Sequence, residues 1–139
     1  MIKAQQIQHI SIPRPPGPDS AAIARAFYSG LLGLEEAPVP KSIQHLDLVW
    51  FRLGNMELHV FSEEPLNDPS GRHYCLVVED LPAAWDKLIE AGYAPWDTIA
   101  IPGRPRFFCR DPFGNTIEFM TIEGNYLELE AQANGQAVG

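Results

Sequence analysis

The sequence predicts an α+β fold built from two tandem βαβββ modules, covering about residues 5–62 and 72–122. Two observations predict it. Strand-like and helix-like segments follow the same order in both stretches, and the landmarks of the first stretch return in the second. These landmarks are His9 and Gly54-Asn55 in the first stretch, and His73 and Gly114-Asn115 in the second. A repeated order of elements is the signature of a duplicated structural unit, and 139 residues suffice for one such domain.

In the first module, the expected elements are a strand over residues 6–12, a helix over 21–32, a weak strand within 34–43, and strands over 46–53 and 56–61. Alternating apolar and polar residues mark the strands, and the proline-rich residues 13–18 are expected to end the first one. Asp19 or Ser20 can cap the helix, and Gly33 suits its C-terminal stop. The apolar face of this helix is predicted as Ile23, Ala26, Phe27 and Leu31.

In the second module, the expected elements are a strand over residues 73–78, a helix over 81–91, a weak strand near 96–100, and strands over 106–110 and 116–121. Asp80 can cap the helix, and Gly92 can stop it. Its apolar face is predicted as Trp85, Leu88 and Ile89. Residues 63–72 are the expected linker between the modules, and the small, polar tail of residues 131–139 is expected to be frayed and flexible.

The composition excludes several classes of partner. The net charge of −8 argues against nucleic acid, because phosphate binding needs clustered positive charge. No stretch approaches the roughly 20 apolar residues of a membrane-spanning helix, so no membrane partner is expected. The N-terminus lacks the apolar region of a signal peptide, which predicts a cytoplasmic protein with Cys75 and Cys109 as reduced thiols.

Several segments, taken in order, resemble the vicinal-oxygen-chelate superfamily of glyoxalases, bleomycin resistance proteins and extradiol dioxygenases. They are IQHISI at 7–12, AFYSGLLGL at 26–34, ELHV at 57–60, GRHYCLVVEDL at 71–81 and RFFCRDPFGNTIEF at 106–119. The resemblance covers about residues 6–121 and is carried by their order and spacing. It implies a curled, cup-shaped mixed sheet with the helices on the outside. It also implies that two modules close around one metal site, within one chain or across a homodimer.

By resemblance, the metal ligands fall on the first and last strands of each module, at His9, His73 and Glu118. A fourth ligand falls on Glu57 or His59, and His59 is the preferred interpretation. Two histidines and a carboxylate suit a divalent ion such as Fe, Mn, Zn, Ni or Co, which acts as a Lewis acid on vicinal oxygens. The alternative for each residue is a packed or solvent-facing side chain, and for the chain as a whole a member without a metal.

The remaining candidates surround this site. Glu118 and Glu57 are the candidate catalytic carboxylates, and a small-molecule substrate is expected to contact Trp50, Arg106 and Phe108. Arg72 and Arg104 are further candidates for holding an anionic group, with solvated surface arginine as the alternative. Cys75 is expected to share the face of His73 and to be an inert, buried thiol, with a thiol that binds the metal or reacts as the alternative. Cys109 is expected to face the packing between sheet and helix.

The predicted function is a divalent-metal-dependent enzyme of glyoxalase type, with isomerase or lyase chemistry on a small vicinal-oxygen substrate. The alternatives are a non-catalytic, drug-sequestering protein of the bleomycin-resistance type, and a dioxygenase or thiol transferase on the same scaffold. The change Glu118→Gln is expected to lower metal affinity by about an order of magnitude or more. Stability is expected to change little or even to improve, because a carboxylate without metal beside Glu57 would suffer charge repulsion.

Overall fold

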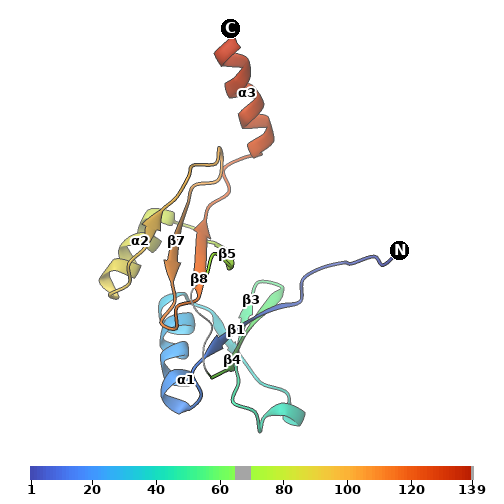
Figure 1. Cartoon of the computed structure of the whole chain (residues 1–139), viewed down its shortest axis with the longest axis vertical. Helices are drawn as coiled ribbons and strands as arrows, with labels where there is room; N and C mark the ends of the chain where they lie inside the picture. The colour runs from blue at the N-terminus through green and yellow to red at the C-terminus, as the bar shows by residue number, and fades with distance from the viewer. Residues whose placement is uncertain (65–69, 139) are drawn as a thin grey trace. The chain divides into compact units, whose positions relative to one another are not determined.

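The computed structural model describes residues 1–64 and 70–138, and it divides the chain into two compact units, Met1–Asp68 and Pro69–Gly139 (Figure 1). Each unit holds one four-stranded mixed sheet, in the order β1-β4-β3-β2 in the first unit and β5-β8-β7-β6 in the second. The α+β prediction with two βαβββ modules is therefore confirmed. The unit boundary falls within the predicted linker, of which residues 65–69 lie outside the described residues.

The first unit contains β1 (His9–Arg14), α1 (Pro18–Arg25), the π-helix η1 (Ala26–Leu31), β2 (Glu35–Ala37), the 3₁₀ turn η2 (Lys41–Ile43), β3 (Val49–Leu53) and β4 (Met56–Ser62). Strand β1 pairs in parallel with β4, whereas β4 with β3 and β3 with β2 are antiparallel. A parallel pair needs a crossover connection, and α1 with η1 supplies it. The helical crossover covers one face of the sheet, where the rings of Tyr28 and Phe51 lie 5.5 Å apart.

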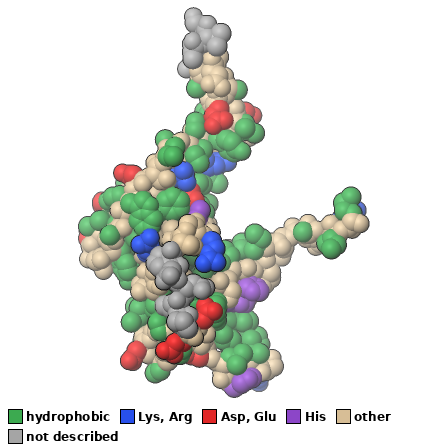
Figure 2. Space-filling view, viewed as in Figure 1, with side chains coloured by type: hydrophobic (Ala, Val, Ile, Leu, Met, Phe, Trp, Pro, Cys, Tyr) green, Lys and Arg blue, Asp and Glu red, His purple; other side chains and the backbone are tan. Residues whose placement is uncertain are grey.

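Strand β1 differs from its prediction at both ends. It begins at His9, and the chain before it carries the exposed apolar side chains of Met1 and Ile2 (Figure 2). It continues through Pro13 to Arg14 rather than ending at residue 12. Proline is tolerated there because β1 lies at the edge of its sheet and pairs on one side only.

The first helix begins earlier than expected, with Gly17 as its N-cap and Pro18 in its first turn. Its buried face also differs from the predicted one, because Ile23 is exposed while the side chains of Ala21, Ala24 and Phe27 are buried. The helix type changes after Arg25. The π-helical part, which includes a bond from Leu32 N to Phe27 O at 2.9 Å, buries the adjacent side chains of Phe27 and Tyr28 and leaves Ala26 exposed, whereas the exposed Ile23 lies in the α-helical part before it.

A fully buried arginine at the end of β1 joins three parts of the first unit. The guanidinium of Arg14 pairs with the carboxylate of Asp47, and its Nη1 donates to Ser20 Oγ at 2.7 Å and to Gly17 O at 3.0 Å. Asp47 Oδ2 also accepts from Gly17 N at 2.8 Å. The Arg14 partner holds the pKa of Asp47 below its ordinary value. This cluster ties β1 to the start of α1 and to the segment before β3.

The second unit contains β5 (His73–Val77), α2 (Leu81–Glu90), β6 (Trp96–Asp97), β7 (Arg106–Arg110), β8 (Thr116–Met120) and α3 (Tyr126–Val138). Strand β5 pairs in parallel with β8, and the remaining pairs are antiparallel, as in the first unit. The Asp80 cap is confirmed, since its carboxylate accepts from Ala83 N at 3.0 Å. Leu88 is buried as predicted, and the ring of Trp85 stands edge-on to that of Phe107 at 5.1 Å, but Ile89 is exposed.

The C-terminal residues form a helix. Residues 131–138, predicted as a frayed tail, continue α3 to Val138, and their flexibility stays a prediction. The backbone at Gly103, where φ is +69°, lies close to the side chain of Leu129 in α3. A Cβ added at Gly103 would lie 2.6 Å from Leu129 Cδ1. In residues 1–64 and 70–138, no helix combines the length and apolar character needed to cross a membrane.

The two hairpins that precede the last strands differ in length. Gly54-Asn55 is a tight turn, with Gly54 at φ 61°, between the paired residues Leu53 and Met56. The second connection, residues 111–115, is longer, and Asp111 organises it by accepting from Asn115 N at 2.8 Å. The two modules therefore share the same pattern of strand pairing, but no single offset in residue number aligns all of their residues.

The Arg14 cluster predicts that Asp47→Asn lowers the stability of the protein at pH 7 by about 1–2 kcal/mol, since it leaves a buried guanidinium without its charged partner. The lowered pKa of Asp47 means that its contribution is present above its ordinary pKa and is lost as the pH falls through the folded-state value. Melting temperatures at pH 7 and pH 3 should show the gap between wild type and variant narrowing in acid. Glu35→Gln, which removes an exposed partner of Arg52, is the control and should change little.

Candidate metal centre

Strand alternation gives each sheet one helix-covered face and one open face. In the first unit, Leu58 and Val60 point to the helix side and are buried, so Glu57 and His59 share the open face. In the second unit, Phe107 and Cys109 are buried, and Arg106 and Phe108 take the open face. The open faces thus carry the predicted site residues of both modules.

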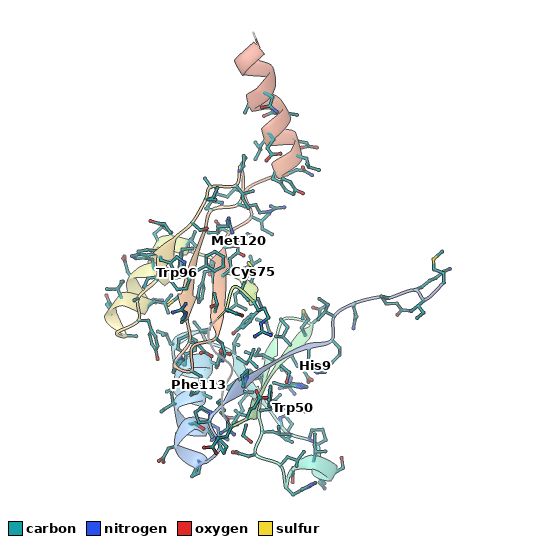
Figure 3. The ribbon with its side chains drawn as sticks, in the orientation of Figure 1. His9, Trp50, Cys75, Trp96, Phe113 and Met120 are labelled. Atoms are coloured by element: carbon teal, nitrogen blue, oxygen red, sulfur yellow. The ribbon has the colours of Figure 1, made fainter. Side chains whose placement is uncertain are left out.

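Three rings lie in a stack on the open face of the first sheet. The ring of His59 lies 4.1 Å from that of His9 and 3.6 Å from that of Trp50, with interplanar angles of 16° and 2° (Figure 3 labels His9 and Trp50). His59 is 8% exposed, whereas His9 is exposed. The stack fixes the plane of the His59 ring between neighbouring strands β1 and β3.

A hydrogen-bonded chain joins the same two histidines through Gln8 and Glu57. Gln8 Nε2 donates to Glu57 Oε1 at 3.1 Å, so its amide oxygen is turned to His9 Nδ1 at 2.6 Å. That oxygen can only accept, so His9 Nδ1 donates, and the tautomer with this proton has its lone pair at Nε2. Glu57 Oε1 also lies 3.0 Å from His59 Nε2, and the bonds from Gln8 and His59 lower the pKa of Glu57.

The open face of the second sheet carries a histidine, a carboxylate and an arginine. His73 Nε2 lies 3.1 Å from Glu118 Oε1, and Arg106 Nη1 donates to Glu118 Oε2 at 3.2 Å. Glu118 is buried, with 6% of its surface exposed. The aromatic ring of Phe108 stands edge-on to the His73 ring, 5.0 Å away.

The protonation of His73 follows from its other nitrogen. Nδ1 lies 2.9 Å from the carbonyl oxygen of Gly71, which only accepts, so Nδ1 donates. In neutral His73, Nε2 then holds a lone pair that faces the carboxylate of Glu118. Two acceptors at this distance require a cation between them, either a proton or a metal ion. A ligating histidine that donates its second N–H to a backbone carbonyl is the usual arrangement at metal sites.

The strand registers decide which residues of the two modules correspond. His9 is the first residue of β1, and His73 is the first residue of β5. Two residues after His9, Ser11 pairs with His59 on β4. Two residues after His73, Cys75 pairs with Glu118 on β8. Trp50 and Phe108 flank these last two positions on the next strand. His59 is therefore the counterpart of Glu118, whereas Glu57 matches Thr116. This register favours His59 over Glu57 as the fourth ligand.

Each unit carries a pair of side chains whose donor atoms can bind a metal ion. The first unit places two imidazoles side by side, and the second places an imidazole beside a carboxylate. Across the described ranges, no three His, Cys, Asp or Glu side chains are grouped so that they could hold an ion together. Nitrogen and oxygen donors of this kind suit divalent transition ions. Each unit thus brings together two of the four predicted ligands.

The predicted substrate-contacting residues are on the open faces but differ in availability. Trp50 is occupied on one side by His59, and Phe108 stacks on Trp96 at 5.7 Å. Arg106 is engaged by Glu118 and by Ile99 O, to which it donates at 2.9 Å. The other two candidate arginines make local bonds, Arg72 to Ser70 Oγ and Arg104 to Gly124 O.

The two cysteines lie on opposite sides of the second sheet. Cys109 is buried in the packing between sheet and helix, as predicted. Cys75 shares the face of His73, also as predicted, but it is exposed rather than buried, because α2 packs on the other face of the sheet, where Trp85 contacts Phe107. Desolvation, with a further contribution from Glu118, raises the pKa of the Cys75 thiol to about 11, so it is protonated at neutral pH.

Three residues that matter for the structure, Gln8, Trp96 and Arg14, are given no role on the basis of the sequence. Gln8 and Trp96 flank the predicted residues, and Arg14 holds the fold of the first unit. Gln8 directly precedes His9, which is its only local signal, whereas the Trp96–Phe108 contact depends on the β6–β7 pairing.

Comparison with known proteins agrees with this geometry. A family model described as the Glyoxalase/Bleomycin resistance protein/Dioxygenase superfamily matches residues 6–119. No curated protein matches the chain. Among solved structures, a glyoxalase family protein from Bacillus anthracis is 34% identical with a TM-score of 0.79, and the match covers 88% of this chain and 98% of that one.

Two more distant structures share the fold. A glyoxalase/dioxygenase from Nostoc punctiforme is 20% identical, with a TM-score of 0.70 and coverage of 89% of this chain and 98% of that one. TnmS3, an antibiotic binding protein from Streptomyces sp. CB03234, is 21% identical, with a TM-score of 0.68 and coverage of 88% and 99%. With most of its length matched by the family model and a well-covered relative above 30% identity, the chain belongs to the glyoxalase/bleomycin resistance protein/dioxygenase superfamily.

Proposed function

We propose that this protein is a divalent-metal-dependent enzyme of glyoxalase type, with isomerase or lyase chemistry on a small substrate that carries vicinal oxygens. The observation that carries the proposal is the approach of His73 Nε2 to Glu118 Oε1 at 3.1 Å, which brings two potential metal donors side by side. The corresponding positions of the first unit hold His9 and His59. Superfamily membership supports a small-molecule ligand.

The proposed ligands are His9 and His59 from the first unit, and His73 and Glu118 from the second, supplied by one chain or by two chains of a homodimer. When bound, a divalent ion supplies Lewis-acid stabilisation of negative charge on the substrate oxygens. The chain's own residues orient the donors, because Gln8 and Gly71 fix the proton on Nδ1 of His9 and His73. Glu57 is ionised at neutral pH, since its pKa is lowered, and it is the carboxylate proposed to accept a proton.

The second candidate is a binding protein without chemistry, located like the first in the cytoplasm. Aromatic side chains on both open faces favour it, with Trp50 on the first sheet and Trp96 and Phe108 on the second. Flat ligands stack on such rings. The candidates differ in their need for the four donors: a sequestering protein retains ligand affinity when the histidines and Glu118 are replaced, whereas the proposed enzyme loses metal and turnover together.

Glu118→Gln tests the metal directly. The substitution keeps the shape but removes the charge, so metal affinity should fall at least tenfold, in the range for altered metal sites. Stability without metal should also fall, because Glu118 has partners in Arg106 and His73; this replaces the sequence-based expectation of little change. Titration with Fe, Mn, Zn, Ni and Co ions by calorimetry measures the first effect, and thermal melting in chelator measures the second. Full metal affinity in the variant would contradict the proposed role of Glu118.

Glu57 and His59 make a matched pair of variants for the fourth ligand. His59→Gln should weaken metal binding by an order of magnitude or more, because it removes a proposed donor. Glu57→Gln should weaken it less and should lower turnover instead, since the amide keeps a hydrogen bond to Gln8 but cannot take a proton. Metal titration of both variants separates the roles. A larger loss of affinity in Glu57→Gln would reverse the assignment made from strand register.

A homodimer is expected, because each sheet exposes an open face and an edge strand, and pairing of modules would cover them. Light scattering at micromolar concentration should give about twice the chain mass of 15.5 kDa. A single species of chain mass under these conditions would exclude a site shared between two chains.

A further inference from the structure

Arg106 is the side chain most closely tied to the carboxylate of Glu118. Its Nη1 donates to Glu118 Oε2 at 3.2 Å, while the other oxygen, Oε1, faces His73 Nε2 at 3.1 Å. The two oxygens of one buried carboxylate are thus divided between an arginine and a histidine. Of the two oxygens of Glu118, Oε1 is the one that faces Nε2 of His73.

Arg106 is also held in place by its other contacts. Nη2 donates to Ile99 O at 2.9 Å, and the guanidinium carbon lies 5.8 Å from the centroid of the Phe108 ring. The side chain is 15% exposed, so its charge is poorly screened by water. Among the described residues, its Nε is buried without a hydrogen-bond partner. A fixed, desolvated positive charge therefore lies against one oxygen of the proposed ligand.

This placement has two physical consequences for a dication at the same carboxylate. The guanidinium engages Oε2, which leaves Oε1 as the available donor and disfavours chelation through both oxygens. Its charge also compensates that of Glu118, so a dication gains less from the carboxylate than it would from an unpaired one. Both effects lower the affinity for the ion and fix the direction of the ligand.

We propose that Arg106 is a positioning residue that commits Glu118 to bind metal through Oε1 alone and that weakens the site's hold on the ion. This inference deepens the proposed function and rests on it. It differs from the sequence-based role of Arg106 as a contact to the substrate. In the absence of metal, Arg106 and His73 together keep the carboxylate compensated and in position.

The test is metal titration of Arg106→Met and Arg106→Gln in the intact 139-residue chain. Both variants remove the charge, and affinity for Co²⁺ or Zn²⁺ should rise about tenfold, within the usual range of coupling between sites. Arg106→Lys keeps the charge and should stay near wild type. The visible absorption of bound Co²⁺ should weaken in the neutral variants, because the freed oxygen raises the coordination number. Arg104→Met is the matched control, since Arg104 bonds to Gly124 O and contacts the ring of Tyr126 instead.

A purely structural role for Arg106 predicts that metal affinity does not rise in the neutral variants. Loss of its bond would then leave Glu118 misplaced, and metal affinity would fall or stay unchanged in both neutral variants, which would overturn the inference while leaving the metal site intact. Should Arg106→Met not fold, Arg106→Gln, which keeps a polar end, carries the measurement alone. Failure of the wild type to bind any of the ions would overturn the proposed function, and the inference with it.

Discussion

The parallel pairing of the first strand of each unit with its last strand is the constraint on which the rest of the structure depends. Successive strands joined by hairpins are antiparallel, so β1 can reach β4, and β5 can reach β8, only because a helical crossover intervenes. Those crossovers cover one face of each sheet and leave the other face open. Alternation then places His9 and His59 on one open face, and His73 and Glu118 on the other.

The two units keep this geometry and differ in chemistry. The first presents two imidazoles, one of them held in a stack between His9 and Trp50, with Glu57 behind as a hydrogen-bond partner. The second presents an imidazole and a carboxylate, with Arg106 as counter-ion. This divergence has little effect on the stability of the fold, because the side chains that differ lie on the open faces and are not part of the apolar core. A duplicated unit can therefore change the side chains on this face without losing its fold.

Two arginines, Arg14 fully buried and Arg106 partly buried, illustrate how context gives the same side chain different roles. Arg14 is surrounded by acceptors from Asp47, Ser20 and the backbone, so removal of its charged partner acts on the stability of the first unit. Arg106 pairs with a residue that also faces a histidine, so its removal is expected to act on the site as well. A buried ion pair by itself is weak evidence of either role, and its surroundings make the distinction.

The sequence by itself determined the order of the elements, both hairpin positions, the Asp80 cap and the alternation that groups His73 with Cys75. These features depend on local patterns of a few residues. It misjudged Ile23, Ile89 and the end of β1, because the buried face of a helix and the reach of a strand depend on what packs against them. Only the tertiary structure decided that His59 corresponds to Glu118, and that Arg106 holds Glu118. The register between distant strands is set by their pairing across the sheet. Because the second hairpin is longer than the first, a constant offset in residue number does not predict which residues correspond.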